Sequence, residues 1–111
     1  MQITSEVIDG KGVLKLDGSL NASTVDAVRD QFHRLLEEHE GVHHWVLDAK
    51  AITFIDSAGL GMLIALLKRL AERGGDLSIA GLSKQTRVVF EITRSYKIFN
   101  LYETLEEALG Q

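Results

Sequence analysis

The sequence predicts an α/β fold: a mixed sheet of four or five strands, made of an N-terminal hairpin and parallel strands, with helices mainly on one face. Three observations lead to this prediction. Two short segments of alternating hydrophobicity come first, as a pair. Further such segments alternate with amphipathic segments of helical period, which is typical of parallel strands joined by right-handed crossovers. The strands also keep polar residues on their second face, which indicates that helices leave that face partly open: Lys15, Asp48 and Ser78.

Length and composition are those of one globular domain, over residues 1–111. A content of 45% hydrophobic and 25% charged residues is ordinary for such a domain. The absence of cysteine excludes disulfides and thiolate metal sites. The sequence has neither a secretory signal pattern nor an apolar run of roughly 20 residues, so we expect a cytoplasmic protein without membrane insertion. A net charge of −4 gives no general attraction for nucleic acid.

The first part of the chain predicts a hairpin followed by a helix. Gln2–Asp9 and Val13–Asp17 alternate as strands around a turn at Gly10–Gly12. The loop Gly18–Asn21 leads into the helix, which ends near Gly41. Either Asn21 or Ser23 is a candidate N-cap of this helix. Its inward-facing residues recur at spacings of three and four: Val25, Val28, Phe32, Leu35 and His39.

The rest of the chain alternates between strands and helices. Trp45–Ala49 alternates as a strand, and an apolar run from Ile52 ends at Asp56-Ser57, where a helix begins. Gly74-Gly75 stops this helix, whose apolar stripe is the strongest in the chain: Leu60, Leu63, Ile64, Leu67, Leu70 and Ala71. The last predicted elements are a strand at Leu77–Ala80, a helix at Lys84–Thr93, an extended segment at Lys97–Leu101 and a closing helix at Glu103–Leu109.

Ser57 occupies a strand-to-helix turn. Backbone N–H groups at a helix start lack intrahelical partners and the helix dipole is positive there, so a phosphate on this serine would be stabilised. Gly59 and Gly61 follow, and each costs about 1 kcal/mol relative to alanine inside a helix. Folding alone therefore does not favour them, and we interpret them as leaving a flat surface for the backbone of another protein.

Loops that follow parallel strands leave the same edge of the sheet, where partner sites gather. Three such loops are expected to meet around Ser57: Ser19–Asn21, Asp56–Gly61 and Gly81–Lys84. The expected partner-binding surface consists of Ser19, Asn21, Asp56, Ser57, Ala58, Gly59, Leu60, Gly61 and Ser83.

The position of Ser57 also fits two other roles. On spacing alone, a simple helix N-cap worth about 1 kcal/mol is an equal alternative, and Asp56 is either a cap or part of a kinase-recognition surface. A hydrolase nucleophile also sits at a strand-to-helix turn. That role fails, because Ile55 stands where the nucleophile elbow needs glycine, and His43 and His44 begin at the far edge of the sheet.

The remaining groupings indicate no catalytic residue, cofactor or metal site. Gly59 and Gly61 lack the further residues of a phosphate-binding loop. The four histidines match no compact set of ligands: His33, His39, His43 and His44. The basic-aromatic cluster is typical of a solvated helix face in an acidic chain, and its members are Arg87, Arg94, Tyr96, Lys97 and Phe99.

The most distinctive segment is D-S-A-G-L-G at Asp56–Gly61, after V-L-D-A-K-A-I-T-F-I. Four further segments accompany it: G-S-L-N at Gly18–Asn21, G-G-D-L at Gly74–Leu77, V-F-E-I-T at Val89–Thr93 and K-I-F at Lys97–Phe99. Together, over essentially the whole chain, they resemble the STAS domain family in its anti-sigma-factor antagonist branch. Two positions depart from the pattern, since many members have an acidic residue at Asn21 and Gly-Leu at Arg94-Ser95.

The resemblance implies a switch and its partners. In such proteins the serine that matches Ser57 is phosphorylated by a serine kinase of the histidine-kinase-like ATPase fold, often the anti-sigma factor itself. A PP2C-type phosphatase removes the phosphate. The unphosphorylated antagonist binds the anti-sigma factor and frees the sigma factor. The departure at Asn21 bears on which partner is recognised and does not affect Ser57 as the acceptor.

Three functions fit this resemblance. The first is a non-enzymatic, phosphorylation-controlled antagonist of an anti-sigma factor. The second is a scaffold or a subunit of a transport assembly, for example for lipids, in which Ser57 is not phosphorylated. The third is the same switch with another output, such as biofilm or cyclase signalling. The intact Ser57 favours the first and third.

Overall fold

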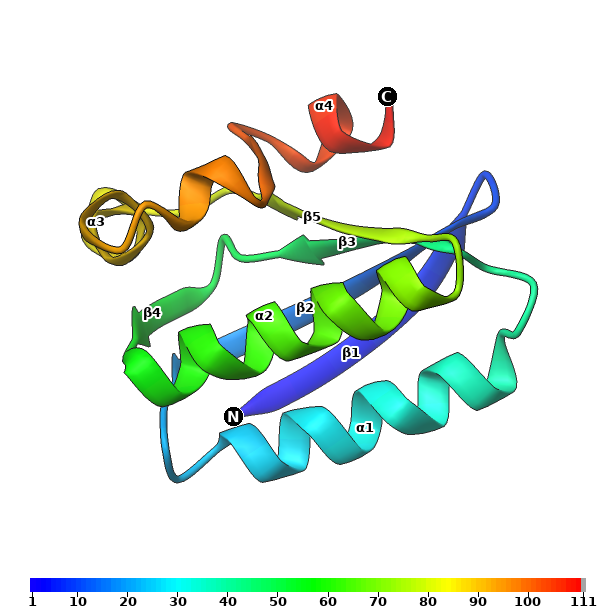
Figure 1. Cartoon of the computed structure of the whole chain (residues 1–111), viewed down its shortest axis with the longest axis horizontal. Coiled ribbons are helices and arrows are strands. Elements are labelled where there is room, and N and C mark those ends of the chain that lie inside the picture. The colour runs from blue at the N-terminus through cyan, green and yellow to red at the C-terminus, as the bar shows by residue number, and fades with distance from the viewer. Residues whose placement is uncertain (111) are drawn as a thin grey trace.

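The computed structural model describes residues 1–110 and consists of a twisted mixed sheet with helices packed on it (Figure 1). The strands follow the order β1-β2-β3-β5-β6, and β4 pairs with the far end of β2. β1 and β2 are antiparallel and all other pairs are parallel, as predicted. The sheet has one strand more than the four or five expected: β1 (Gln2–Ile8), β2 (Lys11–Leu20), β3 (His44–Asp48), β4 (Ile52–Ile55), β5 (Asp76–Ala80) and β6 (Asn100–Tyr102).

The hairpin turn begins one residue earlier than predicted and ends two residues earlier. Ile8 pairs with Lys11, so the turn consists of Asp9 and Gly10 alone, with φ of 49° and 81°. Asp-Gly with both φ values positive is the preferred two-residue hairpin connection. Gly12, which was expected in the turn, lies inside β2 opposite Trp45, and the tryptophan ring occupies the space that a Cβ at this position would need.

β2 is long enough to pair with two strands in succession. Its first half pairs with β3 and its last residues pair with β4, with a shift of register between Gly18 and Ser19. Leu20, at the end of β2, therefore lies beside Ile55, at the end of β4. This arrangement brings the chain after β2 and the chain after β4 to the same place.

Helices cover mainly one face of the sheet, as predicted. α1 (Val25–Glu38) and α2 (Ser57–Glu72) pack there and enclose the main core. The predicted α2 stripe is incomplete, because Met62 and Leu66 are also buried and Ala71 is exposed. α2 packs against α1 as well as against the sheet, so a wider arc of its surface is buried than a single apolar stripe provides.

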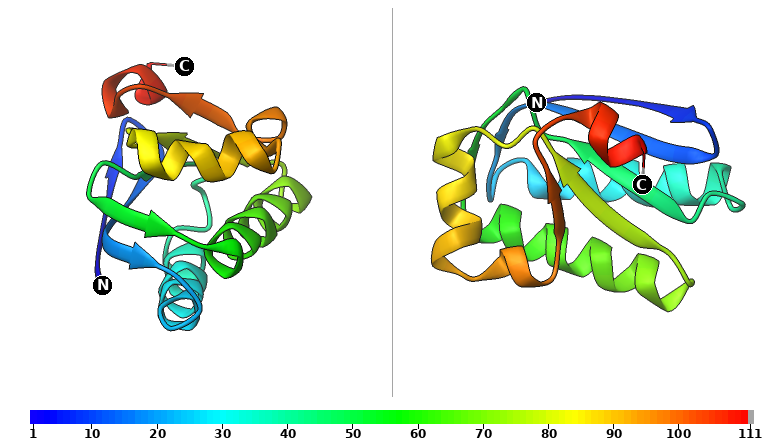
Figure 2. Two further views of the ribbon diagram at one scale, coloured as in Figure 1. Left: turned by 90° about the vertical axis from the view of Figure 1, so that its left-hand side faces the viewer. Right: turned by 90° about the horizontal axis from the view of Figure 1, so that it is seen from above.

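The other face is only partly covered. α4 (Leu105–Leu109) lies on it, opposite α1 and α2 (Figure 2), and its Ala108 packs between Val46 and Ala80. α4 begins after the cap Thr104, so the closing helix is shorter than predicted.

α3 (Lys84–Ile92) packs against β4 at one end of the sheet. The extended segment that was expected at Lys97–Leu101 is displaced towards the C-terminus. A 3₁₀ turn, η1 (Ser95–Lys97), comes first and β6 follows it. Within residues 1–110, no helix has both the length and the apolar character needed to cross a membrane.

Candidate functional site

Asp56, and not Ser57, caps α2. The carboxylate Oδ1 of Asp56 accepts a hydrogen bond of 2.8 Å from the backbone N–H of Gly59. Ser57 is the first helical residue, and its side chain is exposed. Its hydroxyl makes no side-chain hydrogen bond to the described residues 1–110. The N-cap role that the spacing allowed for Ser57 is therefore wrong, and its hydroxyl is open to modification.

The same carboxylate joins α2 to the loop between β2 and α1. Oδ2 of Asp56 accepts a hydrogen bond of 3.2 Å from the N–H of Ala22, and the N–H of Asp56 donates to the carbonyl of Leu20, also at 3.2 Å. Ser19 lies beside β4, with its hydroxyl 3.3 Å from that of Thr53. The structure thus places two of the three expected loops side by side, at the ends of β2 and β4.

Asn21 shapes this loop but does not cap α1. Its side-chain oxygen accepts a hydrogen bond of 2.8 Å from the N–H of Ser23. This bond forms a local turn that contains both residues predicted as possible N-caps. Thr24 stands at the cap position instead, and its hydroxyl donates to the carbonyl of Ser19 at 2.8 Å.

The two glycines of the motif have different environments. Gly59 is buried, and a Cβ at this position would overlap with the backbone carbonyl of Leu20. Close packing of α2 on β2 therefore requires glycine here, which corrects the expectation that folding does not favour it. Gly61 is exposed, with open space where its Cβ would lie. Ala58 is half-buried, whereas Leu60 is 5% exposed and belongs to the core.

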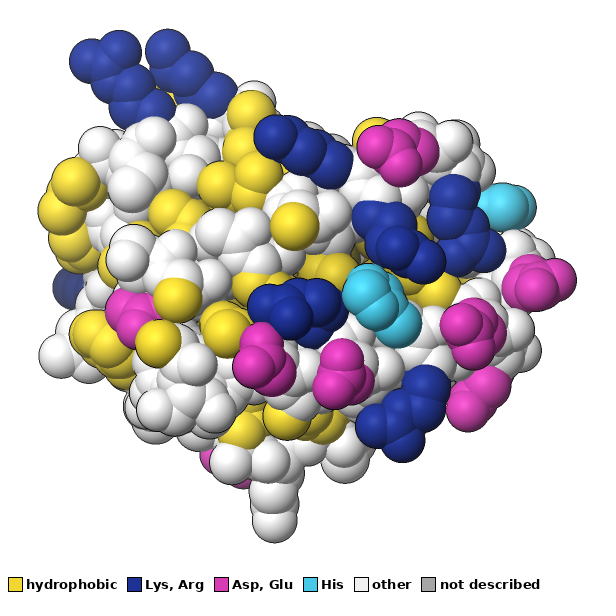
Figure 3. All heavy atoms as spheres, turned by 60° about the horizontal axis from the view of Figure 1, so that its bottom comes forward, with side chains coloured by type: hydrophobic (Ala, Val, Ile, Leu, Met, Phe, Trp, Pro, Cys, Tyr) yellow, Lys and Arg dark blue, Asp and Glu magenta, His cyan; other side chains and the backbone are white. Residues whose placement is uncertain are grey.

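A shallow apolar groove begins at Ser57 and runs between α2 and α3. Its lining combines β4, α2, α3 and η1: Phe54, Leu60, Gly61, Ile64, Val89, Thr93 and Ser95. Phe54 is 54% exposed and Ile92, on the outer side of α3, is 77% exposed. Figure 3 shows most of the acidic and histidine side chains toward the right of the molecule, while apolar side chains are exposed on the left, the end that carries α3, β4 and the start of α2, together with Lys and Arg side chains at its upper corner.

The third expected loop, Gly81–Lys84, does not line the groove. Ser83 caps α3, where its hydroxyl accepts a hydrogen bond of 3.2 Å from the N–H of Thr86. The groove residue of α3 is Val89. Thr93, which directly follows α3, also lines the groove, and its hydroxyl lies 2.7 Å from that of Ser95. No alternating pattern indicates Phe54, because Ile52 and Ile55 are buried while Thr53 and Phe54 between them are exposed. The packing of α3 beside β4 is not visible in the sequence either.

The other groupings are dispersed. Phe99 is buried against Phe90, with ring centroids 5.7 Å apart, and so does not join a surface cluster with the basic residues around it. His39 packs near Trp45, and Nδ1 of His44 lies 3.1 Å from the carboxylate of Asp76. Among the described residues, no three His, Asp or Glu side chains are placed to hold a metal ion.

The chain belongs to the STAS domain family, whose model matches residues 2–108. An anti-sigma F factor antagonist from Paenibacillus polymyxa is 28% identical over 111 residues, which cover 100% of this chain and 94% of that protein. The crystal structure of an anti-sigma factor antagonist from Mycobacterium paratuberculosis superposes with a TM-score of 0.87 at 27% identity, covering 98% of this chain and 91% of that one.

The fold is also that of the Bacillus cell fate determinant SpoIIAA in its phosphorylated form. That structure has a TM-score of 0.74 and 22% identity, and covers 98% of this chain and 97% of that one.

Proposed function

We propose that this protein is a non-enzymatic, phosphorylation-controlled antagonist of an anti-sigma factor. In this proposal, the form with unphosphorylated Ser57 binds an anti-sigma factor that is also a serine kinase of the histidine-kinase-like ATPase fold. Phosphorylation of Ser57 ends the binding, and a PP2C-type phosphatase restores it. The names of the relatives support the antagonist role. The observation that carries the switch is an exposed serine, free of any capping role, at the end of an apolar groove.

The position of Ser57 explains how a phosphate could change binding without changing the fold. The phosphate adds roughly −1.5 to −2 charges at pH 7. At the first helical residue this charge meets unpaired N–H groups and the positive end of the dipole. A partner that covers the groove must remove water from the phosphate, which costs several kcal/mol unless a cation is provided. The cost of desolvating the phosphate therefore weakens the complex and leaves the fold of the free protein unchanged.

The proposal is tested first on the covalent state of the protein. Intact-protein mass spectra from resting and stressed cells should show a one-phosphate increment that varies with condition. The increment should vanish in Ser57→Ala and persist in Ser23→Ala, which removes an exposed serine hydroxyl from the neighbouring loop. Absence of phosphate in every condition, and with candidate kinases in vitro, would instead support the scaffold or transport role.

The groove is tested by partner capture. Exposed aromatic residues at the centre of an interface often account for 2 kcal/mol or more of binding, so Phe54→Ala should weaken binding of the unphosphorylated form by about tenfold or more. Val7→Ala is the matched control, because Val7 is an exposed apolar residue on β1. Equal binding by both variants would remove the groove from the proposed interface.

A further inference from the structure

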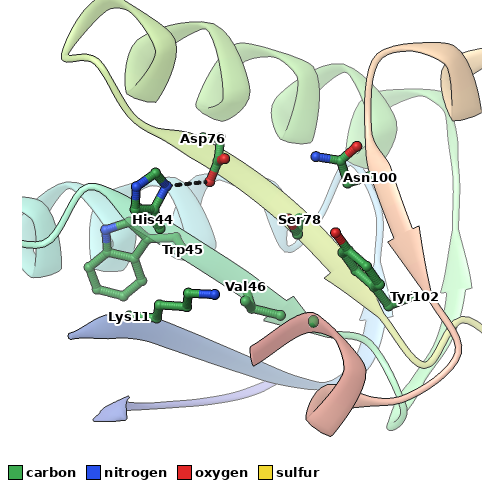
Figure 4. Close-up of a pocket in the computed structure, with 9 residues that line it drawn as sticks. Lys11, His44, Trp45, Val46, Asp76, Ser78, Asn100 and Tyr102 are labelled. Atoms are coloured by element: carbon green, nitrogen blue, oxygen red, sulfur yellow. Dashed lines mark hydrogen bonds and ion pairs between the residues drawn. The ribbon is translucent and has the colours of Figure 1, made fainter. Parts of the chain in front are cut away.

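A second cavity lies on the open face of the sheet, away from Ser57 (Figure 4). It occupies about 200 Å³ between α4 and the first residues of β3 and β5. Val46 and Ala108 give it an apolar floor and wall, and the ring of Tyr102 borders it. The amino group of Lys11 donates a hydrogen bond of 3.1 Å to the carbonyl of Leu109 and so holds the end of α4 at the rim.

Strand register gathers polar side chains around this cavity. His44 is paired with Asp76, and Ser78 with Asn100, while Tyr102 follows two residues after Asn100 on the same face. Figure 4 shows the polar ends of these side chains directed toward the cavity from β3, β5 and β6. Three strands thus supply one polar wall opposite an apolar floor.

Three of these polar groups make no hydrogen bond to the described residues 1–110: the Ser78 hydroxyl, the Asn100 amide and the Tyr102 hydroxyl. The Ser78 residue is 9% exposed, Tyr102 is half-buried and Asn100 is exposed. No side-chain nitrogen or oxygen atom in the described part of the chain is both buried and unpaired. The three groups are therefore open to the cavity and available to a molecule that enters it.

We propose that this cavity binds a small, uncharged polyhydroxylated molecule of about monosaccharide size. Its polar wall mixes an acceptor, the carboxylate of Asp76, with groups that both donate and accept, on Ser78, Asn100 and Tyr102. Hydroxyl groups satisfy all of these at once, because each of them donates and accepts. The opposite charges at the rim, Lys11 and Asp76, favour neither an anion nor a cation.

The size and the floor of the cavity agree with this class of ligand. About 200 Å³ is below the 300–1,000 Å³ that is typical of sites for drug-sized molecules. The apolar surfaces of Val46, Ala108 and the Tyr102 ring suit the C–H face of a small ring. The inference does not depend on the proposed switch, since the cavity shares no residue with the groove at Ser57.

The experiment is a titration of the ¹⁵N-labelled full chain with myo-inositol and with D-glucose, followed by amide chemical shifts. We expect saturable shifts for at least one polyol, confined to the residues around His44, Ser78 and Tyr102. Tyr102→Phe and Ser78→Ala each remove one hydroxyl and should weaken binding about three- to tenfold. Tyr96→Phe is the matched control, because Tyr96 is exposed on η1 outside the cavity, and its affinity should be unchanged.

Several results would overturn the proposal. Saturation by inorganic phosphate or by methylammonium but by neither polyol would show that the site takes an ion. The absence of saturable shifts with both polyols, in a chain whose amide spectrum is that of the folded state, would show that it does not bind this class. Equal weakening by Tyr96→Phe and Tyr102→Phe would place the binding elsewhere.

Discussion

At the scale of single residues, the start of α2 separates a structural task from a chemical one. Asp56 satisfies the backbone of α2 and of the neighbouring loop through its two carboxylate oxygens. Ser57 has no such duty and stays exposed. The separation explains how a covalent change at Ser57 can leave the helix intact. It also predicts that a substitution at Asp56 lowers the stability of the fold, whereas a substitution at Ser57 does not.

Asp56→Ala should destabilise the fold by about 1–2 kcal/mol, because it removes a cap and leaves two N–H groups unpaired. Urea denaturation measures this difference. The control is Asp30→Ala, an exposed position in the middle of α1, where we expect a change within about 0.5 kcal/mol. If Asp56→Ala were as stable as the control, the cap would not contribute to stability.

The two glycines of the motif should respond differently to alanine. Gly59→Ala places a methyl group against the carbonyl of Leu20, so we expect a loss of about 1–3 kcal/mol. Gly61→Ala meets open space and improves helix propensity, so it should be neutral or stabilise by up to about 1 kcal/mol. Thermal unfolding of both variants checks the pair, and similar losses in the two would contradict the packing described for α2.

At the scale of elements, the junction after α3 shows where the chain departs from its family pattern. Arg94 has φ 58° and ψ 22°, the left-handed conformation that glycine adopts most easily. Many members of the family have glycine at this position. Ser95, which follows, is 5% exposed, and its hydroxyl lies 2.7 Å from that of Thr93. The polar pair thus stands at the edge of the groove, and the turn carries backbone strain.

Arg94→Gly should relieve this strain and raise the free energy of unfolding by about 1 kcal/mol. The neighbouring Lys97 lies in η1 without a positive φ, so Lys97→Gly should instead lower stability by a few tenths to about 1 kcal/mol. Chemical denaturation of the two variants gives both values. A loss of stability in Arg94→Gly would mean that the arginine side chain contributes more than its backbone conformation costs.

The sequence was informative about elements to the extent that local periodicity determines them. Alternation and helical spacing predict β1, α1, α2 and β5 closely. They underestimate β2, which runs from Lys11 to Leu20 and so includes most of the predicted loop at Gly18–Asn21. The turn lies at Asp9-Gly10 and not at the predicted Gly10–Gly12, because Gly12 belongs to β2, where the ring of Trp45 packs against it. β6 and η1 lie in a segment whose form depends on packing beside β5, which no local pattern encodes.

The sequence likewise predicts some parts of the candidate site and not others. The Ser57 motif and its neighbouring loop could be located from strand order, since loops after parallel strands meet at one edge. The sequence does not distinguish Asp56 from Ser57 as the cap of α2, whereas the two hydrogen bonds of Asp56 in the structure do. The groove was missed, because it joins Phe54 of β4 to Val89 of α3 across a tertiary contact.

At the scale of the whole molecule, the sheet separates two surfaces. One end carries Ser57 and the apolar groove, and the open face carries the cavity beside α4. The core between α1, α2 and the sheet is continuous and includes Leu60. A charge at Ser57 is therefore added outside this core, and we expect its structural effect to stay local.

Ser57→Asp should keep the backbone of the wild type. Amide chemical shifts should change in the first turns of α2 and in the loop that contacts Asp56, and stay constant across β3 and β5. Ser57→Ala is the control for loss of the hydroxyl alone. Shift changes that extend through the sheet would contradict a surface switch and indicate a rearrangement of the fold.

The buried position of Trp45 also gives the chain an optical property. It is the single tryptophan, is 1% exposed, and has its ring centroid 5.3 Å from that of Phe32 in α1. Trp45 pairs with the first residues of β2, whereas the strand that leads to Ser57 pairs with the last. We therefore expect its fluorescence to report the integrity of the contact between α1 and the sheet and to be insensitive to phosphorylation or partner binding at Ser57. Emission from one native fluorophore thus distinguishes loss of the fold from loss of a partner.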